Sequence, residues 1–186
     1  MKKIALDLDG VVFDSENLFR VYSEIYDTDV NKKDNIVDNT QRTFQKRYSW
    51  SEEESKYFYD KYAEQIIRDA NLMPGADIVL NKLKDSFDFI VVTSRNDLET
   101  DIAREKLKEI GFDIKMFNNE HHKIERLVDE KVDYIIDDDP DICINASDNG
   151  ICALYFKNNA SNRVEKDGVI NVNNWGEVYK HLALKR

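Results

Sequence analysis

The sequence has little cysteine, a deficit of positive charge and no long apolar run. Its only two cysteines are Cys143 and Cys152. No CxxC pair or Cys/His cluster indicates a zinc site, and we interpret both residues as buried free thiols. The chain carries 37 acidic and 27 basic residues, which gives a net charge of -10. Such a charge repels nucleic-acid backbones, so we expect no polymeric nucleic-acid partner.

The apolar runs are too short to cross a membrane. At the N-terminus, the run in MKKIALDLDG is broken by Asp7, so it is typical neither of a signal peptide nor of a membrane span. We therefore expect a cytoplasmic protein with no membrane partner. The length of 186 residues suits one domain, or one domain that carries a modest insertion.

Short β-branched and aliphatic runs alternate with helical patterns along most of the chain. Such runs are typical of strands buried on both faces of a parallel sheet, and the alternation predicts βαβ units. A capping-box pattern places the start of the last helix at Asn174, with Glu177 three residues on. The predicted strands are 2–9, 87–94, 112–117, 132–139 and 151–156, and the predicted helices between them are 76–86, 97–110 and 120–130.

Residues 15–72 interrupt this alternation, because they contain helical patterns and no convincing strand. Ser51 and Glu54 have the spacing of a capping box. We interpret 15–72 as a helical insertion after the first strand, and 1–14 with 73–186 as the core domain. Most of the aromatic residues of the insertion are interpreted as its core, although one or two could stack on a base; those considered are Phe19, Tyr22, Phe44, Tyr48 and Trp50. The basic residues Arg42, Lys46 and Arg47 are interpreted as a solvent-facing cluster.

Polar side chains follow three of the predicted strands. The first strand ends in Asp7-Leu8-Asp9-Gly10, the second in Thr93-Ser94-Arg95 and the fourth in Asp137-Asp138-Asp139, while Lys123 precedes the fourth. Ligands of open parallel sheets bind at the carboxyl ends of the strands. Carboxylates that lie close together repel one another unless a cation neutralises them, and hard oxygen ligands favour Mg²⁺. A carboxylate can also attack phosphorus, and a lysine and a hydroxyl can stabilise phosphoryl oxygens.

These residues resemble the motifs of the haloacid dehalogenase (HAD) superfamily. The segment DLDGVVFD at 7–14 resembles the first motif, DxDG(T/V)xxD. Thr93, Lys123 and Asp137-Asp138 resemble the second, third and fourth motifs in the same order. The resemblance implies an α/β, Rossmann-like parallel sheet with strand order 5-4-1-2-3 and a small helical C1-type cap inserted after strand 1.

The resemblance also implies roles for the first two aspartates. Asp7 corresponds to the nucleophile, which forms an aspartyl-phosphate and binds Mg²⁺. Asp9 corresponds to the general acid/base, and its backbone carbonyl corresponds to a metal ligand. Dehalogenase members lack the second aspartate, so its presence indicates a phosphohydrolase.

The remaining motif residues correspond to phosphate and metal ligands. Thr93, Ser94 and Lys123 are expected to hold the phosphoryl group. Asp138 is expected to bind the metal directly and Asp137 to support it, although a third consecutive aspartate leaves this register open by one residue. Arg95 has two open interpretations, a substrate contact and a salt bridge.

The substrate is expected to be a small phosphomonoester. The segments VVTSR at 91–95 and VNNWGEV at 172–178 resemble the 5′-nucleotidase, deoxyribonucleotidase-like branch, which implies a nucleoside monophosphate. One alternative is a sugar-phosphate phosphatase or phosphomutase of the same fold. Another, from a different class, is a catalytically silent module that binds a small molecule.

Overall fold

The chain divides into two compact units. The computed structural model describes residues 1–33, 38–41, 43–158 and 161–184. The first unit comprises Met1–Asp14 and Leu72–Arg186, and the second comprises Ser15–Asn71. Within the described ranges, no helix is both long and apolar enough to span a membrane.

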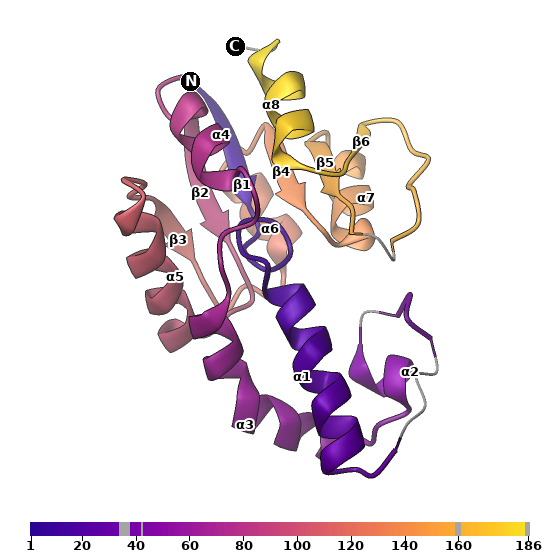
Figure 1. Ribbon diagram of the computed structural model, residues 1–186. Helices are drawn as coiled ribbons and strands as arrows, with labels where there is room; N and C mark the ends of the chain where they lie inside the picture. The colour runs from indigo at the N-terminus through magenta and orange to yellow at the C-terminus, as the bar shows by residue number, and fades with distance from the viewer. Residues whose placement is uncertain (34–37, 42, 159–160, 185–186) are drawn as a thin grey trace. The chain divides into compact units, whose positions relative to one another are not determined.

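The first unit contains a six-stranded sheet in which every neighbouring pair is parallel (Figure 1). The order is β3-β2-β1-β4-β5-β6, which confirms the predicted α/β class and the order of the first five strands. The sixth strand was not predicted, because it is a short edge strand whose sequence, VINV, contains a polar residue. The strands are β1 Lys2–Leu6, β2 Phe87–Val92, β3 Lys115–Phe117, β4 Tyr134–Asp137, β5 Cys152–Phe156 and β6 Val169–Val172.

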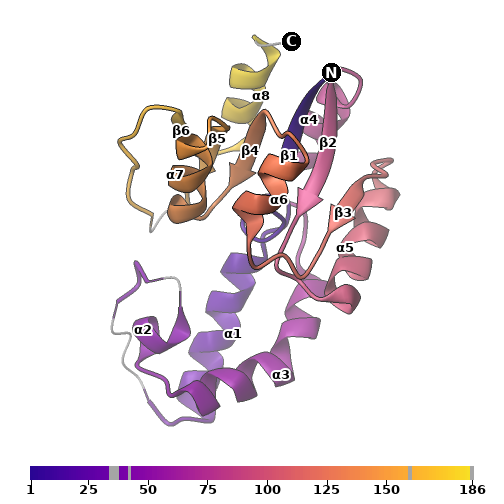
Figure 2. The ribbon, with the colours of Figure 1, turned by 180° about the vertical axis from the view of Figure 1, so that it is seen from behind.

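Helices cover both faces of this sheet. The two views in Figures 1 and 2 show α4 and α8 on one face, and α6 and α7 on the other. As the sequence predicts, the Asn174 side chain caps α8 by accepting a hydrogen bond from the Glu177 N–H at 3.0 Å. The helices of the unit are α4 Ala76–Leu83, α5 Asp97–Glu109, α6 Lys123–Asp129, α7 Pro140–Asp148 and α8 Trp175–Ala183.

Burial on both faces explains the sequence of β1. Ile4, Ala5 and Leu6 have no exposed surface, so consecutive residues are apolar although they point to opposite faces. The central strand therefore delivers Asp7 to the carboxyl edge of a sheet that helices cover on both faces. Of the two thiols, Cys143 is buried as expected and Cys152 is partly exposed, and neither forms a disulfide.

The second unit is a helical unit with an aromatic core. It contains α1 Ser15–Asp29, α2 Phe44–Tyr48 and α3 Glu52–Asp69. Ser51 and Glu54 form the predicted capping box at the start of α3. The core cluster has six buried members and is consistent with the interpretation of most aromatic residues as packing residues; they are Tyr26, Phe44, Tyr48, Trp50, Phe58 and Ile66.

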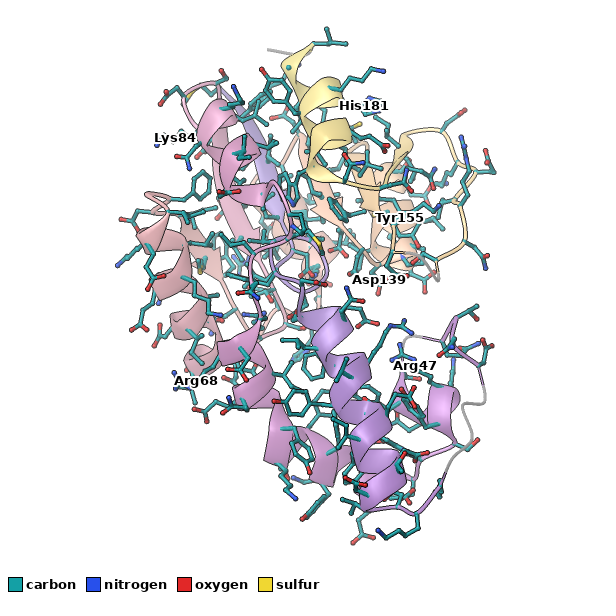
Figure 3. All side chains as sticks on the ribbon, viewed as in Figure 1. Arg47, Arg68, Lys84, Asp139, Tyr155 and His181 are labelled. Carbon is teal, nitrogen blue, oxygen red and sulfur yellow. The ribbon has the colours of Figure 1, made fainter. Side chains whose placement is uncertain are left out.

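The interpretation of Arg47 as a solvent-facing residue is wrong. Its side chain is buried, and Figure 3 labels it in the second unit. The guanidinium lies 3.2 Å from Glu16 Oε1 and donates to the Gln41 carbonyl at 2.8 Å. These partners lie 31 and 6 residues away, so the local basic pattern gave no sign of them. Lys46 is exposed, and Arg42 lies outside the described residues.

Candidate active site

The segment that follows β1 is a buried turn. Leu8, Val11 and Val12 have no exposed surface. The Leu8 carbonyl accepts from the N–H groups of Val12 at 3.0 Å and Phe13 at 2.9 Å. The Met73 N–H donates to the Val12 carbonyl at 2.7 Å, which ties the turn to the chain just before α4. Apolar burial and these hydrogen bonds hold the polar residues of the motif in fixed positions.

Three carboxylates meet where β1 and β4 end. The parallel register pairs Leu6 with Ile136, and the Asp7 N–H donates to the Ile136 carbonyl at 3.0 Å. The register thus places Asp7 beside Asp137. Carboxylate oxygens of Asp7, Asp137 and Asp138 all lie within 4.8 Å of one another, and all three residues are buried.

Gly10 makes the close approach of the fourth motif possible. Its φ is +75°, in the left-handed region that favours glycine. A Cβ at this position would lie 2.6 Å from Asp138 Oδ2, which is closer than real Cβ contacts allow. The glycine therefore leaves the space that the Asp138 carboxylate occupies.

Lys123, the first residue of α6, bridges two of the carboxylates. Its Nζ donates to Asp7 Oδ1 at 2.6 Å and to Asp137 Oδ2 at 3.0 Å. Burial alone would lower the pKa of Lys123, but the carboxylates of Asp137 and Asp7 raise it above its usual value. The side chain is therefore an ammonium ion, held by charge-assisted hydrogen bonds.

The cluster has the composition of a site for a divalent cation. Burial raises the pKa of Asp7 to about 6, with Asp137 and Asp9 adding to the increase and Lys123 opposing it. Lys123 contacts two of the three buried carboxylates, so these four groups together carry two negative charges when all are ionised. A hard cation with oxygen ligands, such as Mg²⁺, would offset that charge, so the residues fit the expected metal.

Asp139 has a structural position at the start of α7, where Figure 3 labels it. Its side chain caps the helix by accepting from the N–H groups of Asp141 at 2.8 Å and Ile142 at 3.3 Å. Its own N–H donates to Asp137 Oδ1 at 2.8 Å. Asp137 is thus bonded through both oxygens, one to this N–H and one to Lys123, whereas Asp138 faces the Gly10 turn.

Thr93 and Ser94 lie at the end of β2, the strand next to β1. Thr93 is buried, its N–H donates to the Phe117 carbonyl at 2.9 Å, and its carbonyl accepts from the Glu120 N–H at 3.0 Å. Ser94 is exposed. The β1–β2 register brings both residues to the edge that carries Asp7.

The Asp9 carboxylate is directed to a residue whose role the sequence left open. It does not belong to the three-carboxylate cluster, but forms a two-point ion pair with Arg95. The two residues are 86 positions apart. Since the strand order brings the ends of β1 and β2 together, the predicted topology was the signal that could have suggested this pair.

The comparison with protein families matches the full length of the chain. The family described as "5′ nucleotidase, deoxy (Pyrimidine), cytosolic type C protein" matches residues 1–186. The chain belongs to this 5′-nucleotidase family. It is therefore a member of the HAD superfamily and a phosphomonoester hydrolase, as the motifs at the strand ends imply. No curated protein matches this 5′-nucleotidase family member in sequence.

Solved structures share the fold of this 5′-nucleotidase family member at low sequence identity. A haloacid dehalogenase-like hydrolase from Streptococcus pneumoniae has 18% identity and a TM-score of 0.74, with 98% of each chain covered. A predicted phosphoglycolate phosphatase from Haemophilus somnus has 16% identity and a TM-score of 0.67, again with 98% of each chain covered. CbbY from Rhodobacter sphaeroides, in complex with xylulose-1,5-bisphosphate, has 14% identity and a TM-score of 0.66, with 95% of this chain and 96% of that chain covered.

Proposed function

We propose that the protein is a cytoplasmic, Mg²⁺-dependent 5′-nucleotidase that hydrolyses nucleoside monophosphates through an aspartyl-phosphate on Asp7. The observation that carries the chemistry is the contact of Asp7 with Lys123 inside a buried carboxylate cluster. The full-length match to a 5′-nucleotidase family described as cytosolic supports the substrate class and the compartment. The second unit, residues 15–71, is proposed as the cap domain.

The first half of the proposed reaction transfers the phosphoryl group to the protein. An Asp7 carboxylate oxygen forms a bond to phosphorus as the bond between phosphorus and the ester oxygen breaks. Asp9 donates a proton to the departing oxygen, so the nucleoside leaves as an alcohol. Lys123, Thr93 and Ser94 hold the phosphoryl oxygens, where negative charge spreads in the transition state.

The second half restores the free protein. Asp9, now a carboxylate, takes a proton from a water molecule that attacks the phosphorus of the aspartyl-phosphate. The bond between phosphorus and the Asp7 oxygen breaks, inorganic phosphate leaves, and Asp7 is again a carboxylate. Each turnover thus consumes one water molecule and returns Asp9 to its protonated form.

Four groups are proposed to hold Mg²⁺. These are the carboxylates of Asp7 and Asp138, the main-chain carbonyl of Asp9, and Asp137 in support. Both oxygens of Asp137 already have hydrogen-bond donors, which supports Asp138 as the direct ligand. When bound, Mg²⁺ supplies positive charge for the phosphoryl oxygens.

Release of phosphate from a panel of nucleoside monophosphates and sugar phosphates, measured with and without Mg²⁺, tests the proposal. We expect nucleoside 5′-monophosphates to be preferred and Asp7→Asn to lose at least about 10³-fold in kcat, since it removes the nucleophile. A strong preference for sugar phosphates would replace the nucleotidase by a sugar-phosphate phosphatase. Equal, negligible rates for wild type and Asp7→Asn on every ester would instead indicate a silent binding module.

A further inference from the structure

The ion pair between Asp9 and Arg95 has the geometry of a fork. Arg95 Nε donates to Asp9 Oδ2 at 2.9 Å, and Arg95 Nη2 donates to Asp9 Oδ1 at 2.6 Å. Two parallel hydrogen bonds fix the distance and also the plane of a carboxylate, which a single contact does not. The Arg95 side chain is 3% exposed, whereas that of Asp9 is 37% exposed. The carboxylate therefore stays open on one side while the guanidinium holds the other.

The guanidinium is itself held by the surrounding chain. It lies over the ring of Phe13, at 5.3 Å from the ring centroid. Phe13 is buried in the same turn as Asp9. The Arg95 N–H donates to Thr93 Oγ1 at 3.3 Å, and the Arg95 carbonyl accepts from the Asn119 N–H at 2.9 Å. Ring stacking and a fixed backbone leave the planar fork little freedom to turn.

The hydrogen bonds of Arg95 differ from those of Lys123, which pairs with residues of the carboxylate cluster. Lys123 already bridges Asp7 and Asp137. The Arg95 guanidinium donates to Asp9 and, at 3.5 Å, to the Glu99 carbonyl. A buried guanidinium that pairs through two hydrogen bonds with Asp9, which lies outside the cluster, indicates a role specific to that aspartate.

We propose that Arg95 is a positioning residue, which holds the Asp9 carboxyl group in the orientation required for proton transfer to the ester oxygen. The inference rests on the proposed function, in which Asp9 is the general acid/base. The fork uses one lone pair on each Asp9 oxygen, and the remaining lone pairs on the exposed side exchange the proton with the leaving group. Lysine cannot replace this arginine, because an ammonium ion is a point charge that does not fix the plane of a carboxylate.

Two substrates that differ in their need for a general acid test this role. The leaving group of a nucleoside 5′-monophosphate is the nucleoside 5′-oxygen, an alkoxide that needs a proton. The leaving group of p-nitrophenyl phosphate is a phenolate that is stable without one. Arg95→Lys should lower kcat/KM for the nucleotide by about 10- to 100-fold, the usual effect of losing an orienting partner. For the aryl ester we expect a change of less than about 3-fold, because the charge is retained and the acid is not needed.

Controls separate orientation from general damage. Arg104→Lys, in an ion pair with Asp101 on α5, makes the same substitution at a more exposed site and should leave both substrates unchanged. In the Asp9→Asn background, Arg95→Lys should not change the ratio of kcat/KM for the two substrates any further. The effects of two residues that act as a unit are not additive. If Arg95→Lys does not fold, Phe13→Leu removes the ring beneath the guanidinium and should show the same order of losses.

The outcomes distinguish the two proposals. Equal losses on both substrates, or none, in a folded Arg95→Lys variant would overturn the positioning role while leaving the phosphatase intact. A wild-type protein that is inactive on both substrates with Mg²⁺ would overturn the proposed function itself. A loss confined to the nucleotide, abolished in the Asp9→Asn background, would establish the role of Arg95.

Discussion

The two units bury polar groups in different ways. In the second unit, buried charged groups face partners within the unit: Trp50 Nε1 donates to Asp27, and Arg47 pairs with Glu16. In the first unit, three buried carboxylates lie close together, and Lys123 pairs with two of them. A protein stabilised only by its own contacts gains nothing from such excess charge. These two buried charged groups of the second unit thus have partners within that unit, whereas the carboxylate cluster of the first unit has an excess of negative charge, which a bound cation would offset under the proposed function.

Among the substitutions that test this comparison, Lys123→Met should have the largest effect, because it removes the ammonium ion from the charged cluster. We expect kcat to fall by about 10²- to 10³-fold, as when a preorganised donor to the transition state is lost. We also expect the free energy of unfolding to fall by about 3–5 kcal/mol, since two buried carboxylates lose their partner. Phosphate release and urea unfolding measure the two effects.

A second substitution shows whether charge is the cause of the lost stability. Asp7→Asn in the Lys123→Met background removes one of the carboxylates that Lys123 contacts. It should recover part of the unfolding free energy while lowering activity further, because the nucleophile is also removed. If Lys123→Met is as stable as the wild type, the contrast between the two units is wrong.

Phe58→Ala should be the corresponding disruption of the second unit. Phe58 has no exposed surface, and its ring packs at 5.0 Å from that of Phe44 and 5.3 Å from that of Trp50. We expect a loss of about 3–5 kcal/mol, as for other buried aromatic truncations. Each unit has one of the two tryptophans, so Trp50 fluorescence in a Trp175→Phe background follows the second unit alone.

Tyr59→Ala is the matched control for that experiment. Tyr59 is adjacent in α3 but 49% exposed, so its truncation should cost less than about 1 kcal/mol. Equal losses for the two variants would show that the aromatic cluster is not the core of the unit.

The same contrast explains what the sequence could predict. Asp7, Lys123 and Asp138 were predictable as neighbours, because buried apolar runs identify the strands and parallel strands end at one edge. The burial of Arg47 was not predicted, and the salt bridge that was one of two interpretations of Arg95 had no predicted partner. Both contacts depend on which distant side chains the tertiary fold brings together. The periodicity of apolar residues in the sequence does not show such contacts. The strand β6 was missed for a related reason, since a four-residue edge strand carries too few residues for a pattern.

Gly10→Ala tests how closely the first and fourth motifs approach, with Gly111→Ala as its control. Both glycines have similar positive φ values, +75° and +73°, so both variants pay about 1–2 kcal/mol for backbone strain. An added Cβ meets Asp138 Oδ2 at 2.6 Å in the first case and nothing within 4 Å in the second. Gly10→Ala should therefore cost about 1–3 kcal/mol more and reduce activity, whereas Gly111→Ala should remain active. Equal behaviour would contradict the close approach.

The smallest effect is expected in the second unit at alkaline pH. Burial raises the pKa of Tyr48 to about 12, and its hydrogen bond to Glu24 Oε1 at 3.0 Å adds to the increase. Because the neutral hydroxyl is favoured in the folded state, its contribution is complete below the unfolded pKa of about 10 and is lost as pH rises toward 12. Tyr48→Phe should lose about 0.5–1.5 kcal/mol at neutral pH through the missing hydrogen bond.

The difference in unfolding free energy between wild type and Tyr48→Phe should then shrink between pH 10 and 12, because only the wild type has this ionising group. Urea unfolding followed by Trp50 fluorescence across that range measures it. Tyr57→Phe, at a half-exposed tyrosine of α3, is the control for removal of a hydroxyl and should change the unfolding free energy by less than about 0.5 kcal/mol at neutral pH. A constant difference for Tyr48→Phe would mean that the hydroxyl is not held by Glu24. The second unit would then have one fewer polar group satisfied by its own contacts, and the contrast with the first unit would weaken.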